Sequence, residues 1–89
     1  MSMSEPETMQ IVRKAIGEVL GVAPETIAGG DDLVDSYNVD SLELMEIGVR
    51  IERALGVRID VDQIRDVRTP NDVVAYVATL PSAPHGVKA

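Results

Sequence analysis

Three segments of the chain repeat apolar residues at intervals of three and four positions, the spacing that places side chains on one face of an α-helix. These segments cover residues 4–20, 40–55 and 69–80. Residues 57–61 alternate as a β-strand does, but one short strand would have no partner. The pattern therefore predicts an all-α fold, and a chain of 89 residues has room for one domain.

Residues that cap helices stand where each pattern begins. Each expected N-cap has an acidic residue three positions later, the spacing of a capping box. The pairs are Ser4 with Glu7, Asp40 with Glu43, and Thr69 with Asp72. Gly21, Gly56 and Pro81 are expected to end these three helices. A further short helical turn is predicted over residues 61–67.

The second helix carries two opposed apolar faces. At 100° per residue, one face holds Leu44, Ile47, Ile51 and Leu55, which are expected to enter the core and meet Val12, Ile16 and Val77. The opposite face holds Leu42, Met45 and Val49. A domain this small can bury one of the two faces, so the other is expected to meet solvent or a partner.

Two stretches show no helical period. Residues 21–38 contain Pro24, a Gly-Gly pair and an Asp-Asp pair, which are typical of a loop, and loops this long are often functional. We expect this loop to be ordered, with its anchors in the core at Val22, Ile27, Leu33 and Val34. Residues 81–89 are small, polar and proline-containing, which predicts a disordered C-terminal tail after a domain spanning residues 5–80.

Charge and composition exclude several classes of protein. Eight Lys and Arg against fifteen Asp and Glu give a net charge of −7, which would repel the phosphates of a nucleic acid. The absence of cysteine excludes disulfides, thiolate metal sites and a cysteine nucleophile. No apolar run approaches the roughly 18 residues of a membrane span, and the acidic N-terminus is unlike a signal peptide. We therefore expect a cytoplasmic monomer.

No set of residues predicts an enzyme or a metal site. His85 is the one histidine, and it stands in the expected tail, where nothing would hold it against a nucleophile. Asp31, Asp32, Asp35 and Asp40 form an acidic cluster, but their spacing does not match the ligand positions of an EF-hand loop. A solvated acidic loop is the favoured interpretation of this cluster.

Ser41 is the candidate functional residue because of its position. It is expected to be the first residue of the second helix, beside free backbone amides and the positive end of the helix dipole. Such a position favours a bound or attached phosphate. Taken alone, the simpler interpretation is that Ser41 helps to start the helix. The combination with a small acidic domain, a structured loop and an outer apolar face points to function.

The stretch from Asp40 to Glu46, Asp-Ser-Leu-Glu-Leu-Met-Glu, resembles the signature of acyl carrier proteins. The resemblance covers about residues 5–80 and includes Asp32-Leu33, residues 55–59 and Thr69-Pro70. It implies a four-helix bundle with a short third helix. It also implies that a phosphopantetheinyl transferase moves 4′-phosphopantetheine from coenzyme A to Ser41, where its thiol holds acyl or aminoacyl groups as thioesters. The chain would then be a non-catalytic carrier.

The residue before the serine bears on the subclass. Asp40 resembles the carriers of fatty-acid and polyketide synthesis, whereas peptidyl carriers more often have His at this position. We expect a carrier for polyketide or related specialised metabolism. A carrier for primary fatty-acid synthesis is the alternative, and an unmodified acidic helical adaptor is a third hypothesis from another class.

Partner enzymes are expected to dock on the outer face of the second helix. By the resemblance, these partners are the transferase, loading enzymes, acyltransferases and ketosynthases with basic docking patches. The expected docking residues are Leu42, Glu43, Met45, Glu46 and Val49. The outer side of this helix is usually strongly acidic in the family, but here Arg50 and Arg53 share it with Glu43, Glu46 and Glu52. This departure predicts more selective recognition.

Overall fold

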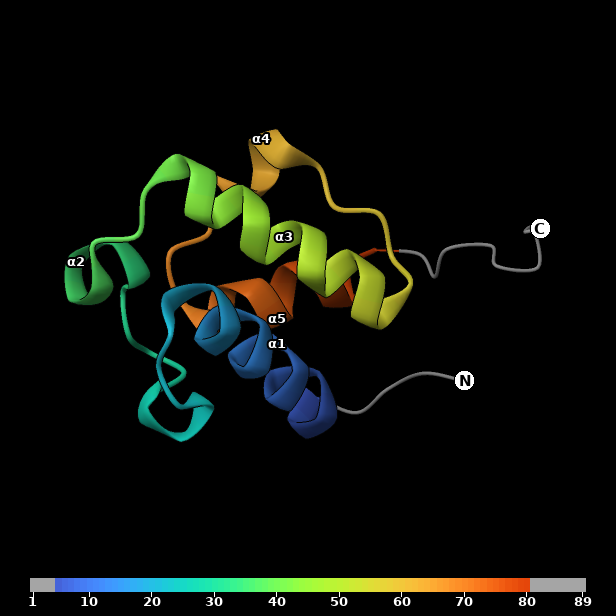
Figure 1. Ribbon diagram of the computed structural model, residues 1–89. Helices are drawn as coiled ribbons and strands as arrows, with labels where there is room; N and C mark the ends of the chain where they lie inside the picture. Colours follow the sequence, from blue (N-terminus) through green and yellow to red (C-terminus); the bar gives the residue numbers. More distant parts are fainter. Residues whose placement is uncertain (1–4, 81–89) are drawn as a thin grey trace.

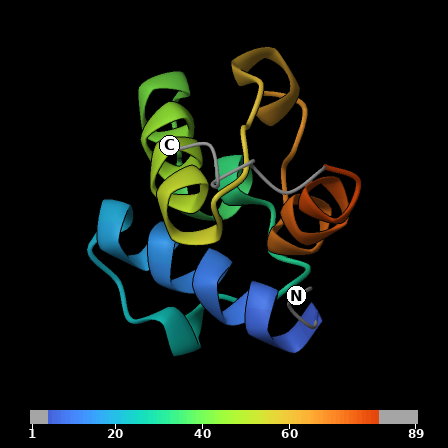
Figure 2. The ribbon, with the colours of Figure 1, turned by 90° about the vertical axis from the view of Figure 1, so that its right-hand side faces the viewer.

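The computed structural model describes residues 5–80, within which every regular element is a helix. The elements are α1 (Glu5–Leu20), the 3-10 turn η1 (Pro24–Thr26), α2 (Leu33–Tyr37), α3 (Ser41–Leu55), α4 (Val61–Ile64) and α5 (Pro70–Ala78). The long helices α1, α3 and α5 surround the core (Figure 1), and α4 lies between α3 and α5 at one edge (Figure 2). The predicted all-α carrier-like bundle is confirmed. The predictions for Ser4, Pro81, His85 and the tail lie outside the described residues.

The helix ends follow the predicted capping residues. Thr69 caps α5, since its hydroxyl accepts a hydrogen bond from the Asp72 amide at 3.0 Å. Gly56 ends α3 with φ of 67°, and Gly21 follows α1 with φ of 74°, both in the left-handed region that glycine adopts without strain. The short helix predicted over residues 61–67 is confirmed but ends at Ile64.

The segment 21–38 is not the plain loop that the sequence predicted. It contains η1 and the one-turn helix α2. The predicted anchors Ile27 and Leu33 are buried, and Val22 packs against the core. Val34 is half-buried and is not among the core residues that the structure describes, because the helical turn of α2 rotates it away from Leu33. The buried Val39 takes the anchoring role instead.

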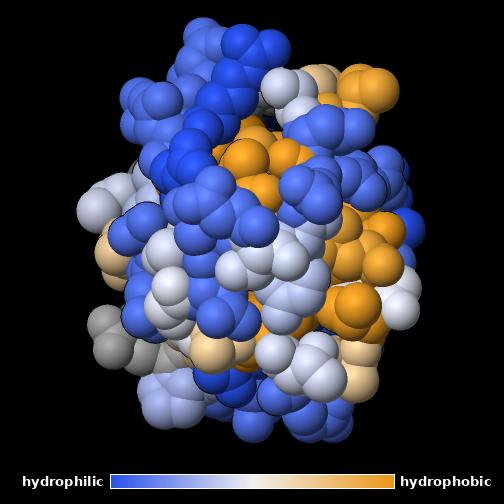
Figure 3. All heavy atoms as spheres, turned by 90° about the vertical axis from the view of Figure 1, so that its left-hand side faces the viewer, coloured by the Kyte–Doolittle hydropathy of each residue, from blue (hydrophilic) through white to orange (hydrophobic). Residues whose placement is uncertain are grey.

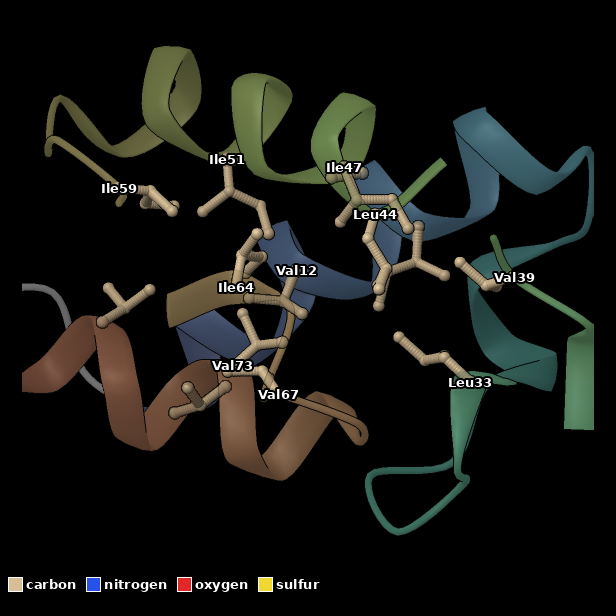
Figure 4. Close-up of a cluster of buried hydrophobic side chains, with 14 of the residues drawn as sticks. Val12, Leu33, Val39, Leu44, Ile47, Ile51, Ile59, Ile64, Val67 and Val73 are labelled. Carbon is tan, nitrogen blue, oxygen red and sulfur yellow. The ribbon is translucent and has the colours of Figure 1, made fainter. Parts of the chain in front are cut away.

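The core is aliphatic and forms where α1, α3, α4 and α5 converge. Figure 4 shows Ile47 and Ile51 of α3 pointing inward, and Leu33 and Val39 near Leu44. The other fully buried core side chains of the three long helices include Val12, Ile16 and Val73. The predicted inner face of α3 is therefore confirmed, with Leu55 partly buried at its end.

The two tyrosines pack at the edge of the core and use their hydroxyls as polar ties. The Tyr37 hydroxyl donates to the Thr26 carbonyl at 3.2 Å and lies 3.4 Å from a carboxylate oxygen of Asp31. The Tyr76 hydroxyl accepts from the Asp60 amide at 3.1 Å. One tyrosine thus fastens the segment after α1, and the other fastens the connection between α3 and α4 to α5.

Candidate functional site

The start of α3 is built by a reciprocal capping box. Asp40 has extended backbone (φ −96°, ψ −179°), and its carboxylate accepts from the Glu43 amide at 2.8 Å. In return, the Glu43 carboxylate accepts from the Asp40 amide at 3.1 Å. Both bonds satisfy backbone donors that a helix start leaves unpaired. The Asp40–Glu43 capping box was predicted from the sequence, and the structure contains it.

Ser41 is the first residue of α3 and is exposed. The first intrahelical bond runs from the Leu44 amide to the Asp40 carbonyl at 2.9 Å. Within residues 5–80, no acceptor is bonded to the amides of Ser41 and Leu42. Two free N–H groups therefore stand beside the Ser41 hydroxyl at the positive end of a 15-residue helix. This arrangement suits a phosphate ester on the hydroxyl.

The short helix α2 and its C-cap hold the chain that leads to Ser41. Asn38 ends α2 in the left-handed region, with φ of 54° and ψ of 39°. Asn accepts this conformation more readily than most residues do. The next residue, Val39, is buried, and its amide donates to the Leu33 carbonyl at 3.3 Å. The site is thus fixed from both sides, by the capping box and by this turn.

Arg68 ties α2 to the segment before α5. The Leu33 amide donates to the Arg68 carbonyl at 2.7 Å, and the guanidinium contacts Asp32 at 2.7 Å and Asp35 at 3.5 Å. Asp32 also caps α2 through the Asp35 amide. The hydrogen bond from Arg68, with the helix amides, lowers the pKa of the Asp32 carboxyl below its usual range. The same contact raises the pKa of Arg68.

The acidic cluster of the sequence is thus used for structure in the described part of the chain. Asp31 accepts from the Ala28 amide at 2.9 Å, Asp32 and Asp35 face Arg68, and Asp40 caps α3. No group of three or more His, Cys, Asp or Glu within residues 5–80 is placed to hold a metal ion. The Asp residues therefore act separately, Asp31 as a hydrogen-bond acceptor in the loop and the others as helix caps or ion-pair partners.

The outer face of α3 exposes large apolar side chains beside Ser41. Leu42 is 74% exposed, Met45 37% and Val49 40%. We call these three residues the outer stripe. On the side of the molecule that bears α2 and the start of α3, hydrophobic side chains reach the surface among hydrophilic ones (Figure 3). The predicted exposure of the stripe is observed, and it extends away from Ser41 along the helix.

Reasoning from the sequence missed two contributors to the site. The helix α2 is only five residues long, too short to show a period, although its Asp32-x-x-Asp35 spacing was a usable capping signal. Arg68 lies 36 residues from Asp32, and no local pattern links the two. Such a contact is set by the packing of the whole bundle.

Comparison with known proteins finds a matching family model and several similar chains. The family model for the phosphopantetheine attachment site matches residues 10–77. The meromycolate extension acyl carrier protein of Mycolicibacterium aurum is 35% identical over 80 residues, which cover 90% of this chain and 82% of the relative. An acyl carrier protein of Thermobifida fusca is 34% identical over 86% of this chain and 98% of its own length.

The chain belongs to the acyl carrier protein family. Members of this family are non-catalytic carriers that hold phosphopantetheine and interact with biosynthetic enzymes and with the transferase that attaches the group. The role of carrier and the identity of the cofactor, both implied by the resemblance in the sequence, are thereby confirmed.

Solved structures agree with the fold of this acyl carrier protein. A free-standing peptidyl carrier protein from a secondary metabolic pathway of Acinetobacter baumannii superposes with a TM-score of 0.74 at 21% identity, covering 85% of this chain and 94% of that one. The acyl carrier protein of Enterococcus faecalis superposes with a TM-score of 0.71 at 23% identity, covering 89% of this chain and 100% of that one.

No helix within the described residues is long and apolar enough to cross a membrane.

Proposed function

We propose that Ser41 carries the 4′-phosphopantetheine of this acyl carrier protein. The observation that carries the proposal is the exposed Ser41 hydroxyl beside the two free amides at the start of α3. Asp40 and Glu43 support the assignment because their mutual bonds keep this end of the helix open without occupying those two amides.

The residues at the start of α3 fit the phosphate of a phosphopantetheine group. The Ser41 and Leu42 amides would hold the phosphate oxygens, and the helix dipole favours their negative charge. When bound, the group supplies a terminal thiol that holds acyl chains as thioesters. Because the chain has no cysteine, no other thiol of the carrier would compete for those acyl chains. The carrier domain is proposed to span residues 5–80.

The docking surface is proposed to be the outer stripe with Glu43 and Glu46. Exposed apolar side chains contribute little to the fold but can anchor a transient interface. Neighbouring carboxylates would steer basic partners, mainly through the association rate. These partners are the phosphopantetheinyl transferase, loading enzymes, acyltransferases and ketosynthases.

We further propose an acyl cargo, carried for polyketide or related specialised metabolism. Asp40 before the serine supports the acyl cargo, and the two arginines on the outer side of α3 support a pathway other than primary fatty-acid synthesis. Lipid synthesis, with primary fatty-acid synthesis as its common form, is the second candidate, because the relatives named above include meromycolate extension and general acyl carrier proteins. The family match favours either one over an unmodified adaptor.

An intact mass measurement tests the attachment site. The full chain is incubated with coenzyme A and a broad-specificity phosphopantetheinyl transferase. We expect wild type to gain the mass of one phosphopantetheine and Ser41→Ala to gain none, with unchanged helical circular dichroism. Ser36→Ala is the matched control, since Ser36 is also exposed but lies within α2. A mass gain on Ser41→Ala would show that the assignment is wrong.

A loading assay separates the two candidate pathways. The phosphopantetheinylated chain competes with the fatty-acid carrier of its own source organism. The two carriers compete for the malonyl transferase and the ketosynthase of primary fatty-acid synthesis in that organism. A dedicated carrier should show kcat/KM at least about tenfold lower, a difference of about 1.4 kcal/mol. Equal values would favour primary fatty-acid synthesis.

A further inference from the structure

Arg53 continues the outer stripe at its far end. It follows Val49 by four residues and Leu42 by eleven, so at 100° per residue it lies within about 40° of both on the helix surface. The Arg53 side chain is exposed. Twelve residues separate it from Ser41, which is about 18 Å along the helix axis. Any partner that lies along the stripe toward this end of α3 therefore also meets Arg53.

The carboxylates of α3 are already engaged within the fold. Glu43 belongs to the capping box, and Glu52 accepts from the Ile59 amide. Glu46 pairs with Arg50 at 3.2 Å. Each of them therefore offers a partner less free negative charge than the sequence suggests.

The two arginines of α3 differ. Arg50 also pairs with Glu18 of α1 at 3.1 Å, so two carboxylates balance its charge. Among the residues whose side chains the structure describes (6–60 and 62–80), Arg53 has no hydrogen-bond or ion-pair partner. The helix positions from which an acid could reach it hold Val49, Arg50, Gly56 and Val57. Of the charged side chains of α3, Arg53 is thus the one for which the described side chains and backbone provide no partner.

We propose that the enzyme that uses this carrier presents an acidic side chain opposite Arg53, next to an apolar socket for Met45 and Val49. The inference rests on the proposed function and deepens it by naming the chemistry of the partner. A guanidinium that becomes covered without an opposite charge weakens an interface, whereas a matched pair strengthens it and selects against other partners. The outer side of α3 therefore carries carboxylates that are already engaged within the fold near Ser41, and a basic side chain without a described partner at its far end.

Two other occupants of this face fit less well. A second copy lying along α3 would cover Ser41, which must stay accessible to the transferase. The outer stripe of three side chains is also small beside the roughly 800 Å² that each partner buries in a stable dimer. An anionic membrane surface would repel a chain of net charge −7.

Arg53 lies in the last turn of α3, where its charge also affects the stability of the fold. The test must separate this effect from any effect on partner binding. A cation there interacts favourably with the C-terminal end of the helix dipole. Arg53→Lys keeps that interaction and the charge, whereas Arg53→Glu reverses both. The unfolding midpoint of every variant is therefore measured together with its turnover.

The experiment uses the full chain after conversion by excess transferase and coenzyme A. The probes are the acyltransferases and ketosynthases of the source organism, and the one with the highest kcat/KM for wild type is chosen. We expect Arg53→Glu to lower its kcat/KM at least about tenfold, mainly through KM, and Arg53→Lys to stay within about twofold of wild type. Lys14→Glu, an equal charge change on an exposed residue of α1, is the matched control.

Charge reversal on the enzyme completes the test. Acidic residues within about 20 Å of its active-site entrance, a span set by the length of α3, are replaced by Lys one at a time. One replacement should restore turnover with Arg53→Glu. Equal losses for Arg53→Glu and Lys14→Glu, or no restoring replacement, would overturn the proposal.

Three further outcomes would also decide the matter. A dimer of wild type that Arg53→Glu dissociates would make a second copy the occupant. A phosphopantetheinylated chain that none of these enzymes uses would overturn the proposed partner. A chain that gains no phosphopantetheine would instead refute the proposed function, before Arg53 is tested at all.

Discussion

Met45 and Ile51 stand six residues apart on α3 in opposite surroundings. Ile51 is fully buried among the side chains of the core, whereas Met45 is 37% exposed on the outer stripe. The energetic meaning of an apolar residue depends on this difference, because burial stabilises the fold and exposure leaves the residue available to a partner.

This pair of residues gives a test of the two-faced helix. Ile51→Ala should lower the free energy of unfolding by about 2–5 kcal/mol, out of the roughly 5–15 kcal/mol typical of a domain. Met45→Ala should change it by no more than about 0.5 kcal/mol but impair acyl transfer to the cognate enzyme. Denaturant unfolding and partner turnover are measured for both. Equal destabilisation would place Met45 in the core.

Much of the site at residue scale could be predicted from the sequence. The role of Asp40 and Glu43 follows from a local spacing, and the burial of Leu44, Ile47 and Ile51 follows from a period along one helix. The engagement of Glu52 with the Ile59 amide could not be predicted in this way. It depends on how the chain turns after α3, which no helical period describes.

At the scale of the elements, α1 and α3 each contain a buried glycine, Gly17 and Gly48, and the space around the two differs. A Cβ at Gly17 would lie 2.6 Å from the Val22 carbonyl oxygen, because the chain folds back against α1 after Gly21. A Cβ at Gly48 would meet Ile64 and Ile59 at 3.7 and 3.8 Å, ordinary contact distances. The first glycine permits a close approach, and the second leaves room for a methyl group.

Substitution by alanine should therefore have opposite effects at the two glycines. Gly48→Ala should stabilise the fold by up to about 1 kcal/mol, the difference in helix propensity. Gly17→Ala should destabilise it by about 1–3 kcal/mol, because the backbone around Val22 must move. Thermal or denaturant unfolding of the two variants checks this. Stabilisation by both changes would contradict the close approach at Gly17.

The bounds of an element were predictable mainly where the element is long, and the short α4 was predicted over residues 61–67 but ends at Ile64. The boundaries of α3 and the start of α5 followed from caps and periods, but α2 did not, since one turn shows no repeat. The glycine in α1 also looked like any other in the sequence, because the atom that it must avoid belongs to a loop whose path is set by the core.

Across the whole molecule, Arg68 joins parts of the chain that are distant in sequence. Its carbonyl and guanidinium bind α2 from the segment between α4 and α5, and α2 in turn positions the chain that enters α3. The ion pair with Asp32 is exposed, so it depends on pH and on salt.

The pH dependence of stability should reveal this ion pair. The pKa of Asp32 is lower in the folded chain than in the unfolded one, so the stabilisation is present above the unfolded pKa and is lost as pH falls through the folded pKa. Arg68→Gln should have a lower Tm than wild type at pH 7, and the gap should shrink as pH falls below about 4. Arg65→Gln removes an exposed charge without a described partner and serves as control. A gap that does not change with pH would contradict the ion pair.

The two tyrosines that make the polar ties also determine the ultraviolet fluorescence of the chain. With no tryptophan and two tyrosines, its ultraviolet emission comes from Tyr37 and Tyr76 alone, which report on the segment after α1 and on the attachment of α5. Replacing either by Phe isolates the other as a single native fluorophore. Light at the red edge of tryptophan absorption does not excite tyrosine. With such excitation, the fluorescence of a complex would come from the tryptophans of the partner enzyme.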